Sequence, residues 1–122
     1  MDAARIVVDL LNASGVGATA YYGVPGPRPT DAPSPEPFVV VEQTGGSRSE
    51  RVARTLAVDA DCWATTRRGA SVLADAVADA LERMPDELDD VFWVSVSSVY
   101  NNPDLDSGTP RYTVSISFGA NV

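Results

Sequence analysis

The hydrophobic and polar positions divide the chain into two segments with a helical period and five with the character of strands. In residues 3–13, apolar side chains recur three and four positions apart, which predicts an amphipathic helix. A longer helix is predicted over residues 67–84, where Thr65 or Thr66 caps the start and Pro85 marks the end. The apolar stripe of this second helix comprises Ala70, Leu73, Ala74, Val77, Ala80, Leu81 and Met84.

Five further segments favour strands, because aromatic and β-branched residues are frequent in them or alternate with polar ones. They are residues 18–24, 38–43, 54–66, 91–100 and 111–119. In the third and the last of these, alternation places successive side chains on opposite faces of a sheet. The faces opposite the apolar ones carry Asp59, Asp61 and Trp63 in the third strand and Arg111, Thr113, Ser115 and Ser117 in the last.

The order of the predicted elements is α-β-β-β-α-β-β, which indicates the α+β class. At 122 residues, the chain has the length of a single domain, and residues 1–122 are taken as one. We expect a mostly antiparallel sheet with both helices packed on one face, because each element buries its apolar side against another.

Two connections stand out by their composition. Residues 24–37 contain six of the nine prolines, which predicts an extended crossover because proline has no N–H for a sheet. An alternative interpretation is a proline-rich peptide that another domain binds. Residues 44–54 predict a flexible arm that carries Arg48, Arg51 and Arg54. This arm is either a solvated loop or a segment that docks onto acidic neighbours, including a copy of the same protein.

The composition narrows the function further. There is no histidine, which excludes Ser-His-Asp and Cys-His catalysis and ordinary zinc sites, and Cys62 has no partner for an intrachain disulfide. The net charge of −8 is opposite to that of proteins that grip nucleic acid or membranes. We find no apolar stretch long enough to span a membrane, and charges at Asp2, Arg5 and Asp9 interrupt any signal peptide. We therefore expect no cofactor and a cytoplasmic site of synthesis.

Two groups of carboxylates are candidates for a metal site. The stretch from Asp104 to Gly108 begins like a calcium loop, but position 5 is Gly108, position 6 is Thr109 and position 12 is Ser115, so the spacing predicts a turn instead. Asp59 and Asp61 lie about 7 Å apart on one strand face, a spacing that suits magnesium in a small metal-dependent hydrolase. The chain has no lysine or histidine to assist them, so a solvated strand face is the favoured interpretation.

Several stretches together resemble a known family. They are the "YYGVPG" strand and turn, "PFVVVEQTGG" after the proline-rich crossover, "DCWATTRRGASVLADAV" running from strand into helix, and the closing "NPDLDSGTPRYTVSIS". In order and phrasing they resemble the small tail-terminator and head–tail joining proteins of long-tailed bacteriophages, especially those of actinobacterial hosts. The resemblance covers nearly the full length.

The resemblance implies a structural, non-enzymatic protein of the virion neck with a sheet and flanking helices. Tail terminators of this family form a ring, typically a hexamer, that caps the tail tube, stops its polymerisation and meets the head connector. The implied partners are further copies, the major tail tube protein and a head-side connector or stopper, while genome DNA passes through the lumen unbound. A head-completion stopper is the nearest alternative. Candidate contact residues are Arg48, Arg51, Arg54, Trp63 and Arg111.

Overall fold

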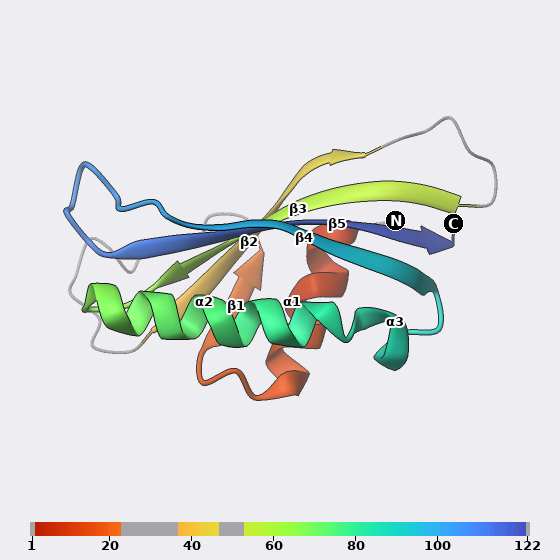
Figure 1. The fold of residues 1–122 in the computed structure, drawn as a ribbon, viewed down its shortest axis with the longest axis horizontal. Coiled ribbons are helices and arrows are strands. Elements are labelled where there is room, and N and C mark those ends of the chain that lie inside the picture. Colours follow the sequence, from red (N-terminus) through yellow and green to blue (C-terminus); the bar gives the residue numbers. More distant parts are fainter. Residues whose placement is uncertain (1, 23–36, 47–52, 122) are drawn as a thin grey trace.

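The computed structural model describes residues 2–22, 37–46 and 53–121, and for residues 22, 53 and 54 it describes the backbone alone. Figure 1 shows one layer of strands with the helices on one side of it. The elements are α1 (Ala3–Ser14), β1 (Thr19–Tyr22), β2 (Phe38–Gly46), β3 (Ala53–Trp63), α2 (Arg67–Glu82), α3 (Met84–Glu87), β4 (Val91–Asn101) and β5 (Arg111–Asn121). The predicted α+β class and element order are confirmed, with the short α3 as an addition.

The five strands form one sheet in the order β1-β2-β3-β5-β4. β1 runs parallel to β2, and the other neighbouring pairs are antiparallel, so the sheet is mostly antiparallel as predicted. β5 lies between β3 and β4, which makes β1 and β4 the two edge strands. The last strand of the sequence is therefore an interior strand, while the strand before it is an edge.

The hydrophobic core lies between the sheet and the helices. The predicted alternation is confirmed in β3 and β5: Val58 and Ile116 pair across the two strands and point into the core, whereas their neighbours Asp59 and Ser115 point to the other face. α1 contributes Val7 and Leu11 to the core, and α2 contributes Val77 and Leu81. The described helices all pack on one face of the sheet (Figure 1), and none of them covers the opposite face.

The ends of the helices follow local side-chain chemistry. The Asp2 carboxylate accepts the backbone N–H of Arg5 at the start of α1, and the Thr66 hydroxyl accepts that of Gly69 at the start of α2. Gly15 ends α1 in the left-handed region, with φ at 67°. The predicted second helix ends at Glu82 rather than at residue 84. A separate short helix, α3, begins at Met84 and has a proline in its first turn, a position that proline favours.

The hairpin of β2 and β3 is longer than the sequence predicts. Thr44–Gly46 and the first residues of β3 lie in strands rather than in a loop, and Gly46 pairs with Leu56. A register shift between Gln43 and Gly45 marks the place where β2 departs from regular pairing. The remaining part of the predicted arm, and all but the last residue of the proline-rich crossover, lie outside the described residues.

The edge at β1 is satisfied by a side chain of α1. The Asn12 amide donates to the carbonyl of Ala20 at 3.1 Å, and its oxygen accepts the N–H of Ala20 at 2.8 Å. A single asparagine thus occupies both backbone groups of one β1 residue, as a further strand would. Covering an edge in this way removes sites at which another chain could pair.

Candidate assembly surface

The face of the sheet that no described helix covers, here called the helix-free face, is a candidate surface for contacts with other molecules. The strand register sets its side chains in rows: Asp59 lies opposite Ser115, Asp61 opposite Thr113, and Trp63 opposite Arg111. The rows run across β3 and β5, two neighbouring interior strands of the sheet. The alternation in the sequence predicted which side chains lie on this face. Which of them are neighbours across strands became clear only from the strand pairing in the structure.

The two aspartates on the helix-free face are held by hydroxyl groups of β5. Ser115 donates to Asp59 at 2.7 Å, and Thr113 donates to Asp61 at 2.7 Å. The amide of Asn102 in turn donates to the Thr113 hydroxyl at 3.1 Å. Burial raises the pKa of Asp61 above its ordinary value, although the Thr113 hydrogen bond and the charge of Arg111 oppose that shift. Asp61 is thus a partly desolvated carboxylate within a polar network.

This arrangement does not resemble a metal centre. Within residues 2–22, 37–46 and 53–121, no three His, Cys, Asp or Glu side chains gather at one place. One oxygen of each aspartate already accepts a hydroxyl hydrogen bond across the strands. Magnesium sites that rely on few carboxylates take their remaining oxygens from water and substrate phosphates. The geometry supports cross-strand hydrogen bonding by two half-buried carboxylates, which differs from the solvated strand face that the sequence favoured.

At one end of the helix-free face, aromatic and cationic side chains form a stack. The rings of Phe38 and Trp63 are stacked, with centroids 5.5 Å apart and an interplanar angle of 9°. The guanidinium carbon of Arg111 lies 4.9 Å from the centroid of the Trp63 ring, and its Nε donates to the carbonyl of Asn102 at 2.7 Å. A cation–π contact of this kind stabilises one position of the Arg111 side chain over the Trp63 ring.

Trp63 is only 8% exposed in the single chain, and its indole N–H finds no partner among the described residues. The structure thus joins two of the predicted contact residues, Trp63 and Arg111, in one cluster. Sequence reasoning missed Phe38, the third member. The signal was present, because Phe38 opens a strand whose next residue, Val39, is buried on the core side.

The arginines of the predicted arm are placed less fully. Arg48 and Arg51 lie outside the described residues. Arg54 lies in β3, where its backbone is opposite Ala120 of β5, and its side chain is not described. Their role in contacts with other subunits stays a prediction.

A second aromatic pair lies at the opposite end of the sheet, on β4. A register shift between Val91 and Trp93 leaves Phe92 as an extra residue, and Trp93 lies opposite Gly119. A side chain at Gly119 would collide with this pair, since a Cβ there would be 2.0 Å from the indole nitrogen of Trp93 and 2.8 Å from the Phe92 ring. Gly119 therefore provides the space in which Trp93 lies against the sheet. The predictions for contact residues did not include Phe92 or Trp93.

Comparison with known proteins now identifies the family. The sequence model of the family described as "Tail completion protein gp17" matches residues 6–122. The chain belongs to this tail-completion family. It is therefore a bacteriophage tail-completion protein and a structural component of the virion.

A solved structure supports the fold of this tail-completion protein. This chain is similar to the solved structure titled "Structure of bacteriophage SPP1 gp17 protein", with a TM-score of 0.57; the match covers 93% of this chain and 85% of that one. The two sequences are 18% identical, so the likeness concerns the fold. No curated protein matches the sequence. In the described part of the chain, the helices are too short or too polar to cross a membrane.

The turn between β4 and β5 in this tail-completion protein has the structure predicted from its spacing. Asp104 accepts the Ser107 hydroxyl at 2.6 Å, and its backbone carbonyl accepts the N–H of Gly108. The Ser107 hydrogen bond holds the pKa of Asp104 below its ordinary value. Gly108 takes a left-handed conformation, with φ at 70°. The carboxylate thus serves the turn that the spacing predicts.

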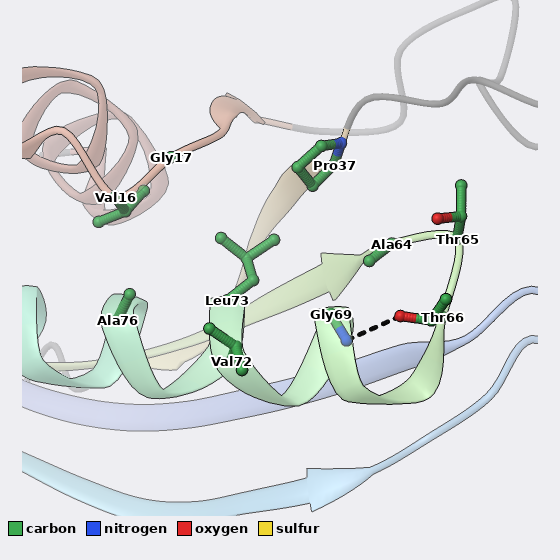
Figure 2. Close-up of a pocket in the computed structure, with 10 residues that line it drawn as sticks. All are labelled: Val16, Gly17, Pro37, Ala64, Thr65, Thr66, Gly69, Val72, Leu73 and Ala76. Carbon is green, nitrogen blue, oxygen red and sulfur yellow. Dashed lines mark hydrogen bonds between the residues drawn. The ribbon is translucent and has the colours of Figure 1, made fainter.

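A groove of about 350 Å³ lies between the start of α2 and the ends of α1 and β3. Figure 2 shows Leu73 and Val72 of α2 beside it, with Val16 and Pro37 on the far wall and the Thr66–Gly69 hydrogen bond at its end. Among the described residues, its lining contains no acid, base or cysteine. Cys62 lies elsewhere, fully buried, and burial raises the pKa of its thiol.

Proposed function

We propose that this protein acts as a tail terminator: copies form a ring on the end of the tail tube, stop its polymerisation and join it to the head connector. The observation that carries the proposal is the tail-completion family match, which spans residues 6–122. The partners under this proposal are further copies, the major tail tube protein and a head-side connector or stopper. Six copies are the number that the resemblance implies.

The charge of the protein is compatible with a ring through which DNA passes. The chain carries a net charge of −8, and the helix-free face presents Asp59 and Asp61 among hydroxyl groups. An acidic lumen repels phosphates and leaves the genome free to slide, so a ring with a neutral or basic lumen would contradict this scheme. We propose that the helix-free face lines this lumen. Arg111 keeps its positive charge beside the Trp63 ring and the carbonyl of Asn102, so on this face the two aspartates outnumber one arginine.

The proposal is tested by adding the purified protein to tail tubes growing from the major tail tube protein of the same phage. A terminator shortens the tubes and appears by electron microscopy as a ring at one end of each. Tubes that grow to the same length with no protein at their ends contradict the proposal. Binding to isolated head connectors without any effect on tube growth would instead assign the protein to the neighbouring stopper role.

A further inference from the structure

Exposed apolar side chains gather on β4 and on the turn that follows it. Seven large hydrophobic side chains are exposed among the described residues, and five of them lie between residues 92 and 105. They are Phe92, Trp93, Val99, Tyr100 and Leu105. Scattered hydrophobic side chains are ordinary on a protein surface, whereas a concentration of them in one segment marks a site that another molecule covers.

Leu105 is the most exposed of the five, at 92%, and an ordered turn presents it. The N–H of Asp104 donates to the carbonyl of Thr109 at 3.1 Å, and the N–H of Gly108 donates to the carbonyl of Asp104 at 2.8 Å. The Asp104 carboxylate also accepts the Ser107 hydroxyl. These bonds hold the turn in one conformation, so little further ordering is needed when Leu105 binds an apolar surface.

The groove at the start of α2 is suited to such a side chain. Its volume of about 350 Å³ is within the range of pockets that hold small ligands, and its lining is mostly aliphatic. Figure 2 shows Val72 and Leu73 beside this space, and Val72 is 60% exposed. All ten residues that line the groove belong to the described part of the chain. A leucine side chain that enters it exchanges water for apolar neighbours, which is favourable.

The charges beside the exposed leucine and beside the groove are opposite. Asp104 and Asp106 flank Leu105 in the sequence. Arg67 and Arg68, both exposed, form the start of α2 at the groove. Neither arginine makes an ion pair with a described side chain, and the first turn of α2 contains no acidic residue. Opposite charges across a contact favour its formation and fix its register.

Within one chain these two features do not meet, because Leu105 is exposed in the same structure that contains the groove. A second copy brings both halves of a contact: an apolar side chain between two carboxylates, and an apolar groove beside two arginines. The net charge of −8 opposes the association of copies in general. A local pairing of opposite charges is therefore the arrangement that lets two copies meet.

We propose that the turn between β4 and β5 docks on a second copy of the chain, with Leu105 in the groove at the start of α2. Asp104 and Asp106 then lie beside the two arginines of that copy, and the uncharged end of β4 adjoins the contact. The contact joins two different surfaces, and such head-to-tail contacts form rings when the rotation closes. The inference deepens the proposed function, on which it rests for the assembly of copies, by naming the surfaces that meet.

Removing the apolar side chain of the turn is the first test. Leu105→Ser keeps a turn-forming residue and abolishes the contact with the groove, so we expect self-association at least about tenfold weaker by analytical ultracentrifugation. Tyr21→Ser is the control, because Tyr21 is an exposed side chain on the closed edge at β1; it leaves association within about twofold. Circular dichroism checks that both variants fold. Equal association of Leu105→Ser and the unchanged protein would overturn the proposal.

An exchange of charges tests the polar part of the contact. Arg68 lies one helical turn before Val72, on the same side of α2. Asp106→Arg and Arg68→Asp each bring like charges together, and we expect each to weaken association several-fold at low salt. Both changes in one chain restore the opposite charges, leave the net charge unaltered and should restore association. A double variant as weak as the single ones would overturn the predicted pairing.

Cysteine cross-linking decides which surfaces meet. Leu105→Cys and Val72→Cys are made in separate chains, and Cys62 does not interfere because it is fully buried. In the assembled mixture, a short thiol-reactive cross-linker joins the two variants, since the turn of one chain lies in the groove of the other. Cross-linking of Leu105→Cys with itself alone would show turn against turn, which contradicts the proposal.

The inference and the proposed function fail separately. A protein that stays monomeric at about millimolar concentration, well above the micromolar range of ordinary complexes, overturns the inference. If that monomer still caps growing tubes, the proposed function stands. If Leu105→Ser loses capping while its self-association is unchanged, the turn binds the tail tube protein and the inference is wrong. A protein that associates through the turn and leaves tube growth unchanged retains the inference and loses the function.

Discussion

The two edges of the sheet solve the same problem in different ways. At β1, a short strand is closed by the Asn12 amide, which pairs with the backbone of Ala20. At β4, eleven residues without charge or proline end the sheet, and aromatic side chains are exposed. A protein that acts alone gains from closing both edges. The difference shows that a side chain of the same protein closes the β1 edge, whereas the described residues leave the backbone of β4 open on its outer side.

The largest change in stability is expected at the closed edge. Asn12→Ala removes two hydrogen bonds to the backbone of Ala20 and should lower the free energy of unfolding by about 1–2 kcal/mol, since each such bond contributes about 0.5–1.5 kcal/mol. Urea denaturation followed by circular dichroism measures it. Asn101→Ala on β4 is the control, with an expected loss below about 0.5 kcal/mol. Equal losses at the two positions would remove the contrast between the edges.

A smaller effect is expected where β4 packs its aromatic residues on β5. Gly119→Ala places a methyl group where the Trp93 indole lies and should cost about 1 kcal/mol, because overpacking typically costs 1–3 kcal/mol and a partly exposed indole moves aside. The fluorescence of Trp93 should shift to the red as it becomes more exposed. Gly45→Ala is the control, since its Cβ meets only Ala57 at 3.8 Å. An unchanged spectrum in Gly119→Ala would contradict the described packing.

The smallest effect concerns the helix-free face between the two edges. Burial raises the pKa of Asp61, so between pH 3.8 and that raised value the folded state binds more protons than the unfolded state. Stability from this group therefore falls as pH rises through that window. Asp61→Asn should be more stable than the unchanged protein near pH 7, and the difference should vanish below pH 3.8. Thermal unfolding of both proteins at several pH values measures this difference in stability. A difference that stays constant with pH would contradict a raised pKa of Asp61.

The periodicity of the sequence predicted much of the fold. The alternation around Val58 and Ile116 gave the correct faces of β3 and β5, and the stripe of α2 gave its buried side. The periodicity could not predict strand order, because no local sequence pattern indicates that β5 lies between β3 and β4. The boundary at Gly46 was missed because glycine and serine suggest a loop, while pairing with Leu56 across the hairpin keeps the strand extended.

The candidate contact residues also divide into those that the sequence predicted and those that it missed. Trp63 and Arg111 were each selected from their own strand, and only the register showed that the guanidinium lies against the indole. Phe92 and Trp93 were missed because a register shift, which no pattern of alternation predicts, turns both toward Gly119. The edge character of β4 depends on strand order as well. Properties of one strand were therefore predictable, and properties of pairs of strands were not.

Hydrogen–deuterium exchange, compared between the monomer and the assembled protein, tests the contrast between the edges most directly. In the monomer, the amides of β4 that face away from β5 exchange quickly, because half of the backbone groups of an edge strand have no partner. We predict that assembly slows exchange in Val91–Asn101 and leaves Thr19–Tyr22 unchanged. Assembly that protects Thr19–Tyr22 while β4 continues to exchange at its monomer rate would contradict the account.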